Sequence, residues 1–157
     1  MFSVGDKIVH PVHGAGIIQK IEEKKFLGKV SQYYVLKLPC SDMDVMIPTD
    51  SEISVGIRRI VDKSSIDEAI NILKDKSSSM DVNWNRRCRD NMEMLKTGDI
   101  FKVAEVVRNL TRIDREKKLS AGEKKMLSGA KQILVSEIIL ACGISEREAS
   151  ELVEDAI

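Results

Sequence analysis

The spacing of apolar residues changes sharply near residue 63, and this change constrains the fold more than any other feature of the chain. From Val4 to about Ile60 the apolar residues fall in short bursts divided by Gly, Pro, Asp and Ser, which is typical of β-strands. After Ser64 they recur at three- and four-residue spacing, which places them on one face of a helix. The sequence therefore predicts an α+β protein of two domains.

Residues 1–62 predict a small, strongly bent antiparallel β-barrel of the Tudor or SH3 type. Phe26–Lys29 is expected at the tip of a hairpin, and Gly14 and Gly16 are expected at bends or β-bulges. The predicted strands lie around Ile8–Val9, Ile17–Ile21, Tyr33–Leu38 and Val45–Ile47.

Residues 63–157 predict a compact helical bundle, because apolar residues recur there at helical spacing and four of the five stretches are preceded by a helix-capping signature. Lys76 and Ser77–Ser79 predict a flexible connection between the first two helices. The predicted helices begin near Ser65 with Glu68, at Trp84, after Asp99, after Ser120 with Glu123, and after Ser145 with Glu148.

Charge is distributed unevenly, although 25 Lys and Arg balance 25 Asp and Glu. Residues 1–82 carry 11 basic and 12 acidic side chains, residues 83–131 carry 13 and 7, and residues 132–157 carry 1 and 6. A central segment of net +6 can supply the phosphate contacts that dominate DNA affinity. The neutral total predicts weak binding to bulk DNA, so we expect a DNA-binding protein that another molecule recruits.

Trp84 is the single tryptophan and is followed by three arginines, Arg86, Arg87 and Arg89. An indole beside cations can occupy a distorted base step while the cations bind phosphates. The same position lies on the apolar face of its predicted helix, where tryptophan is ordinarily a core residue. The residues alone leave both interpretations open.

Two lysine pairs suggest a second phosphate-binding surface. Lys124–Lys125 lies in the first turns of the fourth predicted helix, and Lys117–Lys118 lies just before it. Amides at a helix N-terminus also favour phosphate. The alternative is a solvated charged face, which is the commoner situation for lysine pairs.

Metal, catalytic and membrane sites are not expected. His10, His13 and Cys40 lack a further ligand at diagnostic spacing, so the histidines predict a structural turn, and no nucleophile has a base and an orienting acid. Cys40, Cys88 and Cys142 are widely separated and no apolar run approaches about 20 residues, which predicts a soluble, cytoplasmic protein without cofactors.

The chain resembles the CarD/CdnL-type bacterial transcription regulators, which bind RNA polymerase. The resemblance spans both predicted domains. The stretches that carry it are Val4–Gly14, Asn83–Arg87, Lys102–Arg108 and Leu119–Leu127.

The resemblance implies that the N-terminal domain pairs with an exposed sheet edge on the lobe of the polymerase β subunit. It implies that the helical domain meets promoter DNA at the upstream edge of the transcription bubble and stabilises the open complex, with Trp84 as a wedge in the minor groove. The polymerase-binding positions that it implies are Lys24, Val45, Met46 and Ile47, with Met46 where the family often has arginine. The DNA-binding positions are Trp84, Arg86, Arg87, Arg89, Lys124 and Lys125.

Two other functions stay open. One is an architectural DNA-binding protein that acts without polymerase, and the other is a small metal- or thiol-dependent enzyme using His10, His13 and Cys40. We expect a monomer, with a domain-swapped dimer as an alternative if the joints near Ser64 or Ser77 open.

Overall fold

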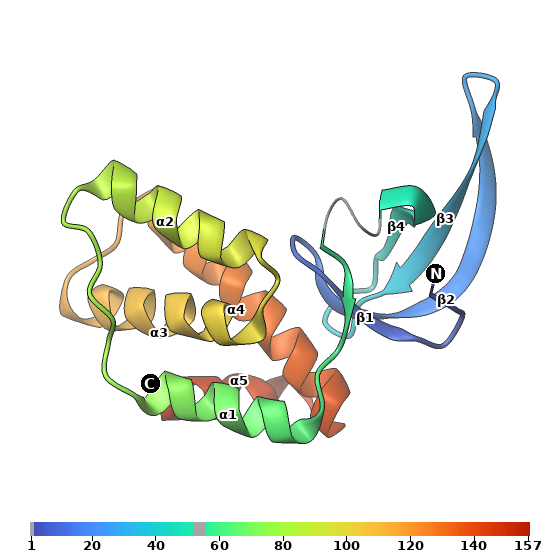
Figure 1. The fold of residues 1–157 in the computed structure, drawn as a ribbon. Helices are drawn as coiled ribbons and strands as arrows, with labels where there is room; N and C mark the ends of the chain where they lie inside the picture. Colours follow the sequence, from blue (N-terminus) through green and yellow to red (C-terminus); the bar gives the residue numbers. More distant parts are fainter. Residues whose placement is uncertain (1, 52–55) are drawn as a thin grey trace.

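The computed structural model describes residues 2–51 and 56–157, which form an antiparallel sheet domain followed by a helical domain (Figure 1). The α+β prediction is confirmed. The strands are β1 (Lys7–His10), β2 (Gly14–Phe26), β3 (Lys29–Lys37), β4 (Asp44–Pro48) and β5 (Arg58–Arg59), with a short 3₁₀ helix at Thr49–Ser51. The helices are α1 (Lys63–Lys74), α2 (Trp84–Lys96), α3 (Ile100–Glu116), α4 (Ala121–Cys142) and α5 (Glu146–Ala156).

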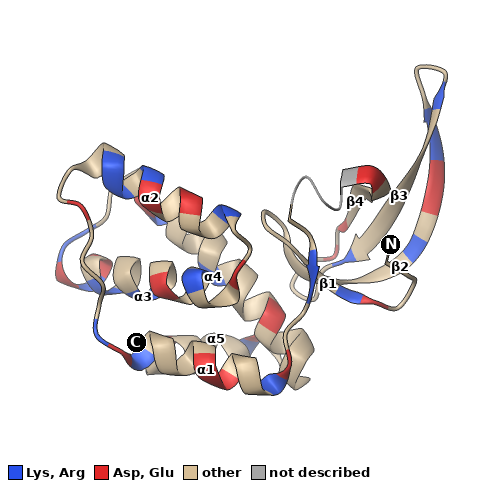
Figure 2. Ribbon diagram, in the orientation of Figure 1, with Lys and Arg blue, Asp and Glu red and all other residues tan. Residues whose placement is uncertain are grey.

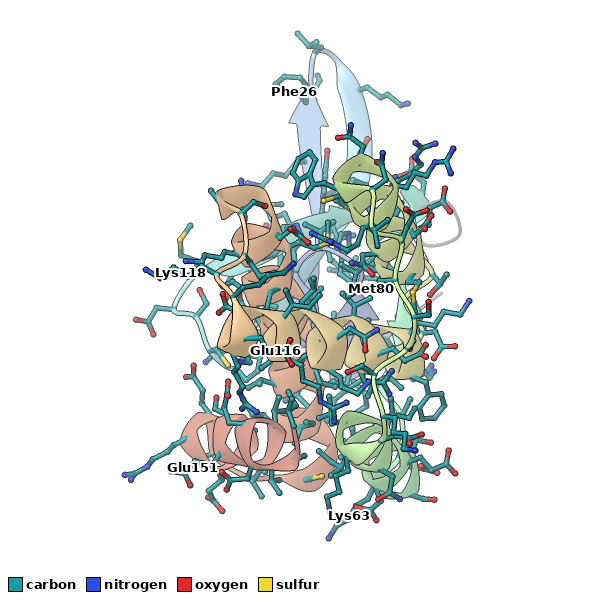
Figure 3. The ribbon with its side chains drawn as sticks, turned by 90° about the vertical axis from the view of Figure 1, so that its left-hand side faces the viewer. Phe26, Lys63, Met80, Glu116, Lys118 and Glu151 are labelled. Carbon is teal, nitrogen blue, oxygen red and sulfur yellow. The ribbon has the colours of Figure 1, made fainter. Side chains whose placement is uncertain are left out.

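The strands are hydrogen-bonded in the order β4-β3-β2-β1-β5, so β4 and β5 are the edges of the described sheet. β2 and β3 project well beyond their neighbours as a two-stranded arm that ends near Phe26 (Figures 1 and 3). Leu27 and Gly28 form the turn with φ of 51° and 80°, which confirms the predicted hairpin tip. The core of the sheet consists of Ile8, Ile18, Tyr34, Leu36, Ile47 and Ile57.

Gly14 and Gly16 are required mainly by close packing, so the expectation of bulges there is wrong. The bulge lies between Ile18 and Lys20. A Cβ at Gly16 would lie 2.7 Å from Leu36, and one at Gly14 would lie 2.7 Å from the Ser136 hydroxyl of the other domain. Gly14 also has a φ of +88°, which confirms a bend at that position.

The helical domain packs around α3 and α4, whose buried side chains include Val106, Leu110, Leu134 and Ile138. The apolar stripes predicted for the first and third helices lie on buried faces. No single helix within the described residues is long and apolar enough to cross a membrane. The bent pair of α4 and α5 meets that test only jointly.

The predicted helix starts are correct except at α1. Asp62, not Ser65, caps α1, because its carboxylate accepts the Ser65 backbone N–H at 2.9 Å, and this bond lowers the pKa of Asp62. Asp99 caps α3 as predicted, and Ser145 forms the predicted capping box with Glu148. Ser120 caps α4, but the Glu123 carboxylate does not complete a box with the Ser120 backbone.

The serine-rich connection between α1 and α2 is bound along α3, contrary to the predicted flexible joint. The Arg108 guanidinium is almost fully buried and donates to the Ile72 carbonyl at 2.9 Å and to the Ser78 hydroxyl at 2.7 Å. Arg112 donates to Ser77 and to the Leu73 carbonyl. These bonds satisfy carbonyls at the end of α1 and hold the connection in place.

Glu137 of α4 joins the two domains. Its buried carboxylate accepts two hydrogen bonds from the Arg58 guanidinium of β5, at 2.7 and 2.8 Å, and a third from the Val61 backbone N–H at 2.9 Å. Arg58 also donates to the Gly98 carbonyl at 2.6 Å. A buried charge with this many donors is fully compensated, so the sheet and the bundle are attached at a defined angle.

A second contact lies one residue earlier in α4. The Ser136 hydroxyl accepts the Ala15 backbone N–H of β2 at 2.8 Å and donates to the Ile133 carbonyl at 2.7 Å. Gly14 lies against the same hydroxyl. Strands β1 and β2 therefore sit directly on α4, with no space for a side chain at Gly14.

Replacing Glu137 by alanine should lower the free energy of unfolding by about 2–4 kcal/mol, because the partly buried Arg58 and the Val61 N–H lose their partner. Glu151→Ala is the control, since Glu151 forms an exposed ion pair with Arg147 and should change stability by less than about 0.5 kcal/mol. Urea denaturation measures both. Equal small effects would contradict the role of Glu137 as the domain junction.

Candidate nucleic-acid interface

Trp84 is the first residue of α2 and projects from the end of the bundle. Asn83 caps the helix by accepting the Arg86 backbone N–H, so the chain before Trp84 is extended and the chain after it is helical. The Trp84 side chain is 48% exposed, which excludes the core alternative. A half-exposed indole at a helix end can present one ring face to a ligand.

The indole is held by the start of α4. Its Nε1–H donates to the Ser120 hydroxyl at 3.2 Å, and the same hydroxyl accepts the Glu123 backbone N–H at 3.2 Å. Behind the ring, Cζ2 lies 3.9 Å from the position that a Cβ on Gly122 would occupy. Because one edge and one side of the ring are fixed, its exposed surface has a defined orientation.

Arg87 has a bracing role that its sequence context did not show. Its Nε and Nη2 donate to the two carboxylate oxygens of Glu123 at 2.9 and 2.8 Å, and both side chains are largely buried. This pair raises the pKa of Arg87 and connects α2 to α4 directly behind Trp84. A phosphate contact by Arg87 stays a prediction, but the geometry favours a role in positioning Trp84.

The other predicted cations lie in the first turns of the same two helices that hold the indole, and they face solvent. Arg86 and Arg89 are exposed on the first turns of α2, and Lys124 and Lys125 are exposed on the first turns of α4. None of these four forms an ion pair with another described residue. Figure 2 shows basic residues along the ribbon at the start of α2, and Figure 3 shows Lys118 at the turn from α3 to α4. The electrostatics suit an anionic polymer.

The residues predicted for polymerase binding lie on the other domain. Val45, Met46 and Ile47 belong to β4, which is an edge strand of the described sheet; Met46 is exposed and Ile47 is buried. Lys24 is exposed on the projecting part of β2. An unpaired edge strand can accept a strand from another protein.

The histidines form a turn, as predicted. The His10 Nδ1 accepts hydrogen bonds from the backbone N–H groups of Val12 and His13 at 3.1 and 3.3 Å. The pKa of His10 is lowered, mainly by burial and to a smaller extent by electrostatic repulsion from His13. Cys40 has the acidic Glu146 as its electrostatic neighbour, and burial raises the pKa of its thiol. No group of three potential metal ligands exists among the described residues.

Comparison with known proteins identifies the family. Residues 2–61 match the CarD-like/TRCF RID domain model, and residues 68–154 match the CarD C-terminal domain model. The chain belongs to the CarD family. It is also 45% identical over 148 residues to the "Putative transcription factor YdeB" of Bacillus subtilis (strain 168), covering 94% of this chain and 97% of that protein. As a CarD-family protein the chain is a transcription regulator, and the comparisons favour this over an enzyme.

Sequence analysis of this CarD-family protein missed Ser120, Glu123 and Gly122 as parts of the tryptophan site. The Ser120 and Glu123 spacing did mark a helix start, but capping accounts for it fully. Only the fold shows that the Ser120 hydroxyl reaches Trp84 and that Glu123 pairs with Arg87. These three residues position the indole, and none of them is one of the exposed cations.

Replacing Ser120 by alanine should remove both the α4 cap and the anchor of the indole. We expect a loss of about 1 kcal/mol in the free energy of unfolding and a red shift of Trp84 emission, because the ring gains freedom and water contact. Ser145→Ala removes the cap of α5 at similar cost and should leave the emission unchanged. Identical emission spectra for both variants would contradict the anchoring of the indole by the Ser120 hydroxyl.

Proposed function

We propose that this protein binds the RNA polymerase β subunit through the edge of its sheet and stabilises the promoter open complex through its helical domain. Trp84 enters the minor groove at the upstream edge of the bubble, and Arg86, Arg89, Lys124 and Lys125 bind the neighbouring phosphates. The observation that carries the proposal is the oriented, half-exposed indole at the helix ends that also carry four exposed cations. Membership of the CarD family supports the same function.

The shape of the indole site explains how binding would favour melted DNA. A flat apolar ring gains contact where bases are already unstacked, whereas regular duplex must first be distorted to admit it. A ligand shifts an equilibrium only by its difference in affinity for the two states. About 1.4 kcal/mol of preference for the open complex changes the ratio tenfold, which is within the range of one well-placed aromatic side chain.

The near-neutral total charge explains why a second anchor is needed. Four exposed cations in the first turns of α2 and α4 give modest affinity for DNA, and the acidic C-terminal segment opposes binding to bulk duplex. Docking the sheet on polymerase places the indole at high effective concentration near one DNA site. Strand pairing by β4 uses backbone groups and so tolerates methionine at position 46.

Removing the indole tests the DNA half of the proposal. Trp84→Ala should bind polymerase with unchanged affinity but shorten open-complex lifetime about tenfold relative to the intact protein, because the preference for melted DNA is lost. Leu152→Ala removes a comparably exposed apolar side chain from α5 and should have no effect. Lifetime after heparin challenge is the measurement. An unchanged lifetime with Trp84→Ala would exclude the wedge.

Reversing charge on the arm tests the polymerase half. Lys24→Glu should weaken binding to the polymerase β lobe several-fold, because Lys24 is an exposed cation that we propose contacts the lobe beside the sheet edge. Lys25→Glu makes the same charge change on the opposite face of β2 and should leave binding intact. Biolayer interferometry with the immobilised lobe compares them. Equal losses would indicate a general charge effect and would contradict docking through the Lys24 face.

A further inference from the structure

An apolar groove of about 470 Å³ lies between the two domains, next to the Trp84 site. Its walls are α2 and α4, and the loop between β1 and β2 closes one end. Met92 and Leu95 line it from α2, Met126 and Ile133 from α4, and Val12 from the loop. The Met92 side chain is 44% exposed, so the groove presents apolar surface to water.

Two glycines keep the floor of the groove open. Gly122 and Gly129 both lie in α4 and both line the groove, and neither has the positive φ that would require glycine. A Cβ at Gly129 would meet no atom within 4 Å. Glycine inside a helix costs about 1 kcal/mol relative to alanine. The packing of this chain alone does not account for Gly129, whereas close approach of a ligand does.

The charged residues of the groove have one sign. Lys96 and Lys125 line opposite walls and both are exposed, and none of the described acidic side chains lines the groove. Their aliphatic stems extend the apolar surface while the ammonium groups stay in water. A ligand that fits must therefore be apolar in the middle and acidic along its sides.

We propose that this groove binds an amphipathic helix with acidic flanks from a protein partner. Methionine-lined grooves between helices adapt to the apolar stripe of such a helix, and Lys96 and Lys125 would pair with acidic residues on either side of that stripe. Phosphate-rich DNA is a poor occupant because the lining is almost wholly apolar. The groove also reaches Gly122 beneath the indole and shares Lys125 with the proposed DNA site, so the partner helix and DNA would compete for Lys125.

A synthetic peptide tests the site without polymerase or promoter. The probe is a helical peptide of about four turns with leucines at heptad a and d positions, glutamates elsewhere, and neither Trp nor Tyr. Binding is followed by anisotropy of the labelled peptide and by emission of Trp84, which lies at one end of the groove. We expect saturable binding with a change in Trp84 emission, and no binding when lysines replace the glutamates.

Gly129→Leu fills the groove from an open helix position and should weaken peptide binding at least tenfold without lowering stability. Met92→Glu should do the same by charge repulsion, whereas Leu152→Glu, at an equally exposed position outside the groove, should not.

Absence of saturable binding, equal binding of the lysine peptide, or full binding by Gly129→Leu would each overturn the proposal. Loss of affinity for duplex DNA in Gly129→Leu would assign the groove to DNA instead. Concentration-dependent dimerisation abolished by Gly129→Leu would assign it to a second copy of the chain. Sedimentation velocity and a labelled duplex distinguish these two outcomes, and either would also overturn the acidic-helix assignment.

Discussion

The buried carboxylate of Glu137 is the interaction on which the arrangement of the two domains depends. A charge removed from water is stable only when its hydrogen bonds are replaced, and Glu137 takes these from Arg58 and from the Val61 backbone at the end of the sheet domain. The adjacent Ser136 hydroxyl bonds the Ala15 N–H, where Gly14 leaves room for nothing larger. One turn of α4 thus sets the angle between sheet and bundle.

The opposite end of α4 carries a second site built by the same chemistry. Glu123 is buried and pairs with Arg87, and the Ser120 hydroxyl holds the indole of Trp84. Because Glu123 and Glu137 lie 14 residues apart in α4, about 21 Å of rigid helix connects the residue that braces the tryptophan with the residue that anchors the sheet. The proposed simultaneous binding of polymerase and DNA would benefit from this fixed separation, since a loosely joined pair of domains loses binding free energy when it becomes ordered.

Periodicity predicted the two domains, the order of strands and helices, and most helix ends, because those depend on local patterns of apolar and capping residues. Periodicity did not predict contacts between residues that are distant in the sequence. Arg87 looked equivalent to Arg86 and Arg89 in sequence, yet only Arg87 faces Glu123. Ser77–Ser79 resembled a flexible joint because their partners, Arg108 and Arg112, lie on another helix. The exposure of Trp84 was ambiguous in the sequence because its partner Ser120 also lies at the start of another helix.

We propose that the protein binds the open promoter complex more tightly than the closed one through the oriented indole of Trp84. The most direct measurement compares its dissociation constant for polymerase holoenzyme on a promoter with a pre-melted bubble against that on the same promoter held closed at low temperature. We expect about tenfold tighter binding to the bubble complex, with the difference lost in Trp84→Ala. Equal dissociation constants for the intact protein would contradict it.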